Sequence, residues 1–238
     1  NWRRGTLGQE TQNTDVQWLR CASGLFIRRH GFGEKLLSMR ELLRKPAAKG
    51  GLVLLSLLPF LGMCWGIYNE QLGPNPAENL IRSTGDWTLR FLCLTLLITP
   101  LRVHSNWPEW LRFRRSLGLL AFFYASLHAL SYSLFDMGWE WDDIVQDILK
   151  RPFIAVGFAA AVLMSLLAAT SFNAAVKAMG AQRWRQLHRA VYVIAILGVL
   201  HFFWMRASKK NFNEVLVYAG ILGSLLGWRL IYFTKRSS

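Results

Sequence analysis

Apolar residues along the chain fall into blocks of about 15 to 20, the length that crosses the hydrocarbon core of a bilayer. Each block is expected to be helical, because a single strand exposed to lipid leaves its backbone polar groups without partners. The pattern predicts an all-α membrane protein, a six-helix transmembrane bundle, with spans at Gly51–Tyr68, Trp87–Leu101, Leu117–Leu134, Phe153–Phe172, Ala190–Met205 and Val215–Phe233. The second and fifth blocks are short for a span and are expected to extend into flanking residues.

Charge predicts how the bundle is oriented. The loops at 102–116 and 173–189 each hold four Lys or Arg against at most one acid, whereas the loops 69–86 and 135–152 are rich in acids. By the positive-inside rule, the basic loops face the cytoplasm, and both termini are therefore predicted to be cytoplasmic. The short loop at 206–214 is mildly basic on the outer side and is the one exception.

Composition excludes several classes of protein. The chain has 28 Lys+Arg against 14 Asp+Glu, but 53% of its residues are hydrophobic, which a disordered or nucleic-acid-binding basic chain would not show. Membrane lipid, and no nucleic acid, is the partner expected for this charge. The three cysteines form no C-x-x-C pair, which excludes thioredoxin-like, zinc-binding and covalent-haem motifs.

Residues 1–50 hold ten Lys or Arg, four acids and no long apolar run, and are predicted to form a basic cytoplasmic tail. The transmembrane domain follows at 51–233, and 234–238 form a second short cytoplasmic tail. A chain that began at Met39 would have a short basic segment just before the first apolar block. We therefore hypothesise that residues 1–38 are an upstream extension. The alternative is a disordered basic arm on the membrane surface. N-terminal sequencing of protein made from the native gene distinguishes the two.

Two histidines lie inside predicted spans, where ionisable side chains are functional by default. His128 is 11 residues after Leu117 and His201 is 11 residues after Ala190, so both lie about 16 Å along parallel helices. Two imidazoles at one depth on two helices are what axial ligation of a haem requires. Without a C-x-x-C-H motif, that haem would be non-covalent, of b type. The alternative is that each histidine hydrogen-bonds a neighbouring helix.

A third histidine, His188, lies 13 residues before His201, about 20 Å nearer the cytoplasm, which suggests a second haem. On an ideal helix, however, 13 residues leave the two imidazoles about 140° apart. The inner end of the third span offers Arg114 and Arg115 where a second ligand would be expected. His188 is therefore either a ligand, opposite His104, another group or water, or a histidine at the membrane interface.

The charged loops allow two interpretations each. The basic rim that includes Arg114 and Arg115 is either the topology signal alone or a site for a phosphate-bearing electron carrier such as flavin mononucleotide. The acidic segment 136–147 is either a solvated short helix or a docking surface for an extracytoplasmic partner.

Several runs resemble the MsrQ (YedZ) family, the haem-binding membrane subunits of bacterial MsrPQ methionine sulfoxide reductase systems. They are Leu-Leu-Ile-Thr-Pro-Leu (96–101), Arg-Phe-Arg-Arg-Ser-Leu-Gly-Leu (112–119), Leu-His-Ala-Leu-Ser-Tyr (127–132), Arg-Pro-Phe (151–153), Arg-Trp-Arg-Gln-Leu-His-Arg-Ala-Val-Tyr (183–192) and His-Phe-Phe-Trp (201–204). The resemblance spans about Leu52–Arg229.

The resemblance implies a ferric-reductase-like transmembrane domain in the bacterial inner membrane, with one or two b haems and FMN. It implies an electron-transfer subunit that serves MsrP, a periplasmic molybdenum-cofactor reductase that repairs methionine sulfoxide in proteins. His128, His188 and His201 stand at the family's haem-ligand positions, and Arg114 and Arg115 at its Arg pair near the proposed flavin region. The wider ferric reductase group has two histidines on each ligand helix, whereas the third span here has one.

The sequence leaves alternatives open for the electron donor and for the function of the chain. The chain has no Gly-rich nucleotide-binding domain, so electrons must come from quinol or a separate cytoplasmic flavin reductase. One rival is a generic transmembrane ferric or metal reductase that needs no partner. Another is a non-redox transporter or scaffold, with His128 and His201 in a proton path or a helix contact.

Overall fold

The computed structural model describes residues 38–207 and 212–237. The chain divides into two compact units, 1–48 and 49–238, and the second contains all of the predicted spans. The hypothesis of an upstream extension concerns residues 1–38. Of these, residues 1–37 lie outside the described residues. All secondary structure in the described part is helical, which confirms the all-α prediction.

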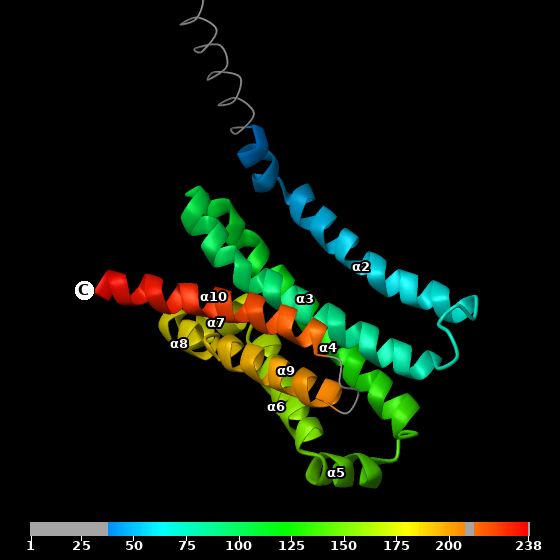
Figure 1. Cartoon of the computed structure of the whole chain (residues 1–238). Coiled ribbons are helices and arrows are strands. Elements are labelled where there is room, and N and C mark those ends of the chain that lie inside the picture. Colours follow the sequence, from blue (N-terminus) through cyan, green and yellow to red (C-terminus); the bar gives the residue numbers. More distant parts are fainter. Residues whose placement is uncertain (1–37, 208–211, 238) are drawn as a thin grey trace, which may run out of the picture. The chain divides into compact units, whose positions relative to one another are not determined.

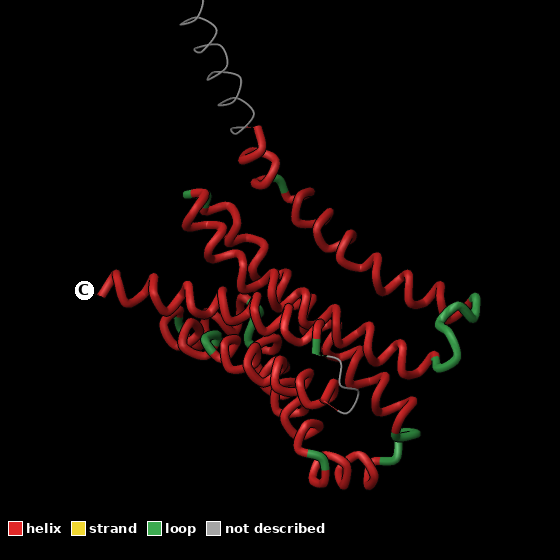
Figure 2. The backbone as a smooth tube through the Cα atoms, viewed as in Figure 1, coloured by secondary structure: helices red, strands yellow, loops and turns green. Residues whose placement is uncertain are grey.

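The helices follow one another with short connections (Figures 1 and 2). They are α2 (Pro46–Tyr68), α3 (Pro76–Ser105), the 3₁₀ turn η1 (Pro108–Trp110), α4 (Leu111–Ser131), the π-helical turn η2 (Tyr132–Asp136), α5 (Trp141–Lys150), α6 (Pro152–Ala169), α7 (Asn173–Met179), α8 (Ala181–Leu187), α9 (Ala190–Ala207) and α10 (Asn213–Ser237).

Five stretches of the described chain are long and apolar enough to cross a membrane, so the protein is a multi-pass membrane protein. They are Pro46–Tyr68, Pro108–Asp136, Pro152–Ala169, Ala181–Ala207 and Asn213–Lys235. Each contains or overlaps one of the predicted blocks. The remaining block, Trp87–Leu101, lies in α3, which is not among the five. The sixth span and the cytoplasmic placement of both termini stay predictions.

The packing of α3 explains its weaker hydropathy. α3 packs along α4 and also contacts α9 and α10, and it buries residues from Leu80 to Pro100 (Figure 1). A helix that faces protein on several sides needs fewer apolar residues than one that faces lipid. Its buried Thr84 and Thr95 hydroxyls donate back to the carbonyls of Leu80 and Phe91, each at 2.7 Å, so their polarity is satisfied within the helix.

Two helix pairs form the body of this unit. The first pair is α3 with α4, the second is α6 with α9, and contacts between α4 and α6 join them. The acidic segment between the pairs folds as α5, as expected for a short helix, although it begins at Trp141 and extends to Lys150. The basic loop 173–189 is also largely helical, as α7 and α8.

A buried tyrosine ties α2 to α4. The Tyr124 hydroxyl donates to the Ser56 carbonyl at 2.7 Å and accepts from the Phe60 N–H at 3.2 Å. Ser56 and Phe60 are an i, i+4 pair of α2 on either side of Pro59, which has no N–H of its own. A side chain inserted beside a proline in this way keeps backbone groups paired where lipid offers no partner.

We expect Tyr124→Phe to lower the free energy of unfolding by about 1 kcal/mol, the scale of interhelical hydrogen bonds in membranes. The measurement is denaturant or thermal unfolding in detergent micelles. Tyr232→Phe is the matched control, because the Tyr232 ring stacks on Trp228 at 5.1 Å and its hydroxyl makes no hydrogen bond within the described residues. Equal effects of the two substitutions would contradict the role assigned to the Tyr124 hydroxyl.

Candidate functional site

The structure brings the rings of His128 in α4 and His201 in α9 close together. Their ring centroids lie 6.1 Å apart, and the ring planes are nearly perpendicular, at 81°. The two residues are far apart in sequence, and the packing of the α3–α4 pair beside the α6–α9 pair brings their rings together. The equal depth that the sequence predicts for these two histidines therefore becomes a direct juxtaposition.

Each of these imidazoles is held by a backbone carbonyl of its partner helix. His128 Nδ1 lies 2.8 Å from the Ile81 oxygen of α3, and His201 Nδ1 lies 2.7 Å from the Phe153 oxygen of α6. A carbonyl oxygen can only accept, so Nδ1 carries the proton in both rings and Nε2 keeps its lone pair. Metal-ligating histidines are oriented by this kind of bond.

The spacing of the two rings fits a shared metal. A metal–imidazole bond is about 2 Å, and each ring centre lies about 1 Å beyond its nitrogen, so axial ligation from both sides separates the centres by about 6 Å. The described chain has no group of three or more His, Cys, Asp or Glu side chains that could hold a metal ion. Two imidazoles at this spacing are compatible with the two axial positions of a metal whose other ligands come from a porphyrin.

The alternative interpretation of the sequence is that each histidine only hydrogen-bonds a neighbouring helix. This interpretation explains one of the two ring nitrogens, Nδ1. The Nδ1 bonds are of that kind. No hydrogen bond to Nε2 of either His128 or His201 occurs among the described residues. A structural role alone therefore leaves the second nitrogen of both rings unexplained.

His188 lies at the carboxyl end of α8 rather than inside one continuous helix with His201. The backbone tightens there, with Arg189 N–H donating to Gln186 and Tyr192 N–H donating to Arg189, both three residues back. The 140° estimate assumed one ideal helix from His188 to His201, and the backbone departs from that geometry near His188.

The contacts of the His188 ring are local. The ring stacks on Trp184 at 4.0 Å, Nδ1 is 3.1 Å from the Trp184 carbonyl, and Nε2 is 3.4 Å from Ser171 Oγ. The ring of His104 instead lies against Trp228 at 5.8 Å. Among the described ring contacts, none joins His188 to His104. The second-haem role of His188 stays a prediction.

The arginine pair at the start of α4 is half-buried. Arg115 Nη1 donates to Asn173 Oδ1 at 2.7 Å and so links α4 to the first residue of α7. This contact holds the two basic segments together. The flavin-phosphate role of Arg114 and Arg115 stays a prediction.

The sequence analysis did not single out Arg229, a buried arginine in α10 that contacts α3 and α9. Arg229 is 4% exposed, and its Nη2 donates to the Leu96 carbonyl at 2.7 Å and to Thr99 Oγ1 at 2.8 Å. Its guanidinium also lies over the Tyr192 ring at 5.1 Å. Pro100 has no N–H to pair with the Leu96 carbonyl four residues back, and Arg229 supplies that donor. An arginine inside an apolar block was the available signal.

A double-mutant cycle tests this pairing. We expect Arg229→Met to lower the free energy of unfolding by about 1–3 kcal/mol, because the Leu96 carbonyl is left unpaired. The loss should be smaller in a Pro100→Ala background, where the new backbone N–H can pair with that carbonyl. Arg229→Met removes the same charge in the Pro100 and the Pro100→Ala backgrounds. The coupling energy between the two substitutions therefore reports the hydrogen bond from Arg229 to the Leu96 carbonyl. The same loss in both backgrounds would contradict the assignment.

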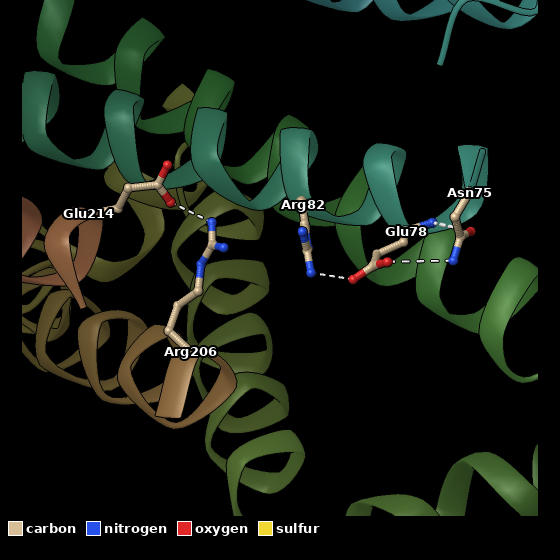
Figure 3. A network of polar contacts seen from close by, with 5 residues as sticks. All are labelled: Asn75, Glu78, Arg82, Arg206 and Glu214. Atoms are coloured by element: carbon tan, nitrogen blue, oxygen red, sulfur yellow. Dashed lines mark hydrogen bonds and ion pairs between the residues drawn. The ribbon is translucent and has the colours of Figure 1, made fainter. Parts of the chain in front are cut away.

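Several charged residues at the opposite end of the bundle form ion pairs. Arg206 at the end of α9 pairs with Glu214 at the start of α10, and Arg82 pairs with Glu78 in α3, where Asn75 caps the helix (Figure 3). In α5, Asp147 accepts from the Tyr132 hydroxyl at 2.5 Å and pairs with Arg151 at 2.8 Å.

The helical bundle agrees with a comparison against known families. The family model described as "Ferric reductase like transmembrane component" matches residues 84–199, a segment that contains His128 and His188 and ends just before His201. The chain is therefore a multi-pass membrane protein with a ferric-reductase-like transmembrane component.

Relatives narrow this class to one family. A protein of Polaromonas naphthalenivorans is 62% identical over 185 residues, which are 78% of this chain and 84% of that protein. Others from Herminiimonas arsenicoxydans and Azospira oryzae are 47% and 49% identical, over 80% and 78% of this chain and 87% and 79% of their own lengths. All three are named "Protein-methionine-sulfoxide reductase heme-binding subunit MsrQ". The chain belongs to the MsrQ family, which confirms the resemblance seen in the sequence.

Proposed function

We propose that this chain is a b-type haem electron-transfer subunit of a protein methionine sulfoxide reductase, with His128 and His201 as the axial ligands of one haem. The observation that carries the proposal is the 6.1 Å separation of two imidazoles whose Nδ1 atoms are both tied to carbonyls. The names of its relatives, heme-binding subunits, support it.

The residues around the pair would orient and tune the ligands. The Ile81 and Phe153 carbonyls hold the two rings in one tautomer and make Nε2 more basic. A bound haem supplies one-electron chemistry, and the protein sets its potential through ligands, burial and hydrogen bonds.

The position of the pair favours electron release at the acidic end. His128 lies eight residues before the end of the span Pro108–Asp136, and His201 lies six before the end of Ala181–Ala207, about 12 Å and 9 Å at the helical rise per residue. On the predicted topology this end faces the periplasm, across the bacterial inner membrane. The acceptor we propose there is an MsrP-like molybdenum-cofactor reductase.

The donor side is the opposite, basic end. We propose that a cytoplasmic flavin reductase or quinol delivers electrons there. The half-buried Arg114 and Arg115 are the proposed contacts for an FMN phosphate, because Arg presents paired donors to phosphate. His188 lies in the same basic region and is the proposed ligand if a second haem is present.

The first test is a dithionite-reduced minus oxidised visible spectrum, with haem counted per chain, of the detergent-purified protein and its histidine variants. We expect His128→Ala and His201→Ala each to abolish the low-spin b-type signal, because each removes one axial ligand. His30→Ala, in the N-terminal tail outside every predicted span, is the control and should retain it. The His188→Ala spectrum then counts the haems. Unchanged haem in both His128→Ala and His201→Ala would contradict the ligand assignment.

A second measurement separates the proposed partner-dependent function from a generic metal reductase. The reduced haem should be reoxidised when the partner reductase and a protein containing methionine sulfoxide are added together. Addition of a ferric chelate alone should leave it reduced on the same timescale. Rapid reoxidation by the chelate without any partner would favour the generic reductase.

A further inference from the structure

Two glycines face the paired histidines at very short range. A Cβ atom at Gly157 of α6 would lie 2.7 Å from Nδ1 and 2.8 Å from Cε1 of His201. A Cβ atom at Gly85 of α3 would lie 3.2 Å and 3.3 Å from the same atoms of His128. Any larger residue at either position would therefore displace the imidazole opposite it.

Both glycines occupy the same place relative to the carbonyl that holds the ring. Gly85 follows Ile81 by four residues, and Gly157 follows Phe153 by four. In an α-helix the carbonyl of one residue points to the N–H four residues later, and the Cβ there leans back toward the helix N-terminus. A side chain at that position would stand where the imidazole approaches the carbonyl.

Other glycines in these helices have ordinary surroundings. A Cβ at Gly118 or Gly198 would meet only one atom of an apolar or methyl group, at 3.8 Å and 3.4 Å. Gly220 and Gly223 in α10 have nothing within 4 Å. A Cβ at Gly66 in α2 would lie 2.8 Å from the Leu72 side chain. Among the described glycines, close approach to a histidine occurs at Gly85 and Gly157 alone.

We propose that Gly85 and Gly157 are positioning residues for the metal-ligating imidazoles. The missing Cβ lets each ring lie directly against a helix backbone, so that Nδ1–H reaches the carbonyl and Nε2 is presented toward the opposite histidine. The inference rests on the proposed ligand role of His128 and His201 and adds the elements that aim them. The α3–α4 and α6–α9 pairs thus build the two halves of the site by the same device.

The test is a haem titration of the apoprotein carrying Gly157→Ala, Gly85→Ala or the matched control Gly220→Ala. We expect Gly157→Ala to weaken haem binding about 10- to 100-fold, the usual effect of losing a group that orients a metal ligand. Gly85→Ala should weaken it less, in line with its longer contact distances, and Gly220→Ala should leave it unchanged. The low-spin spectrum of the haem that still binds should shift in the first two variants only.

Measurements on the apoprotein separate positioning from folding. Ala favours helix more than Gly, so helix content and elution on size exclusion should be unchanged in all three variants. If Gly157→Ala fails to fold, Gly85→Ala carries the test, because a few tenths of an ångström relieve its contact. Haem affinity and spectrum unchanged in both variants would overturn the inference, as would loss of folded apoprotein in both.

The same titration keeps the two proposals apart. If the unsubstituted protein and Gly220→Ala bind no haem, the proposed function fails. If both bind haem and the Gly85 and Gly157 variants bind it equally well, the function stands and only the positioning role falls.

Discussion

The hydrogen bond from an imidazole Nδ1–H to a helix carbonyl is the interaction on which the site depends. It occurs twice, from His128 to Ile81 and from His201 to Phe153. Each bond fixes a tautomer, fixes the plane of a ring and joins the two helices of a pair. With both rings held in this way, the association of the two helix pairs brings the ring centroids to 6.1 Å from each other.

The same principle holds the bundle together elsewhere. The Ser56 carbonyl of α2 accepts a hydrogen bond from Tyr124 of α4, and the Leu96 carbonyl of α3 accepts one from Arg229 of α10. Both of these carbonyls lie near a proline, where the helical ladder is interrupted, and a bilayer offers no water to complete it. These polar residues inside apolar helices each pair a backbone carbonyl of another helix, and the two histidines do the same through Nδ1.

Much of the fold could be predicted from periodicity and length, because a lipid-facing helix must be apolar over its whole span. α3 is where this reasoning is weakest. Protein surrounds it on several sides, so Thr84 and Thr95 are tolerated and its hydropathy falls. The break between α8 and α9 at His188 was also beyond prediction, because apolar periodicity does not report a local change in backbone hydrogen bonding.

The sequence by itself determined the class of protein, the residue type at the site and the equal depth of His128 and His201, since these depend on composition and on rise per residue. Only the tertiary structure decided which backbone atoms hold the rings, how the rings face each other, and why Gly85 and Gly157 lie opposite them. The reason is that a carbonyl and a missing Cβ leave no distinctive trace in a hydrophobic pattern. Their role depends on which side chain of another helix packs against them.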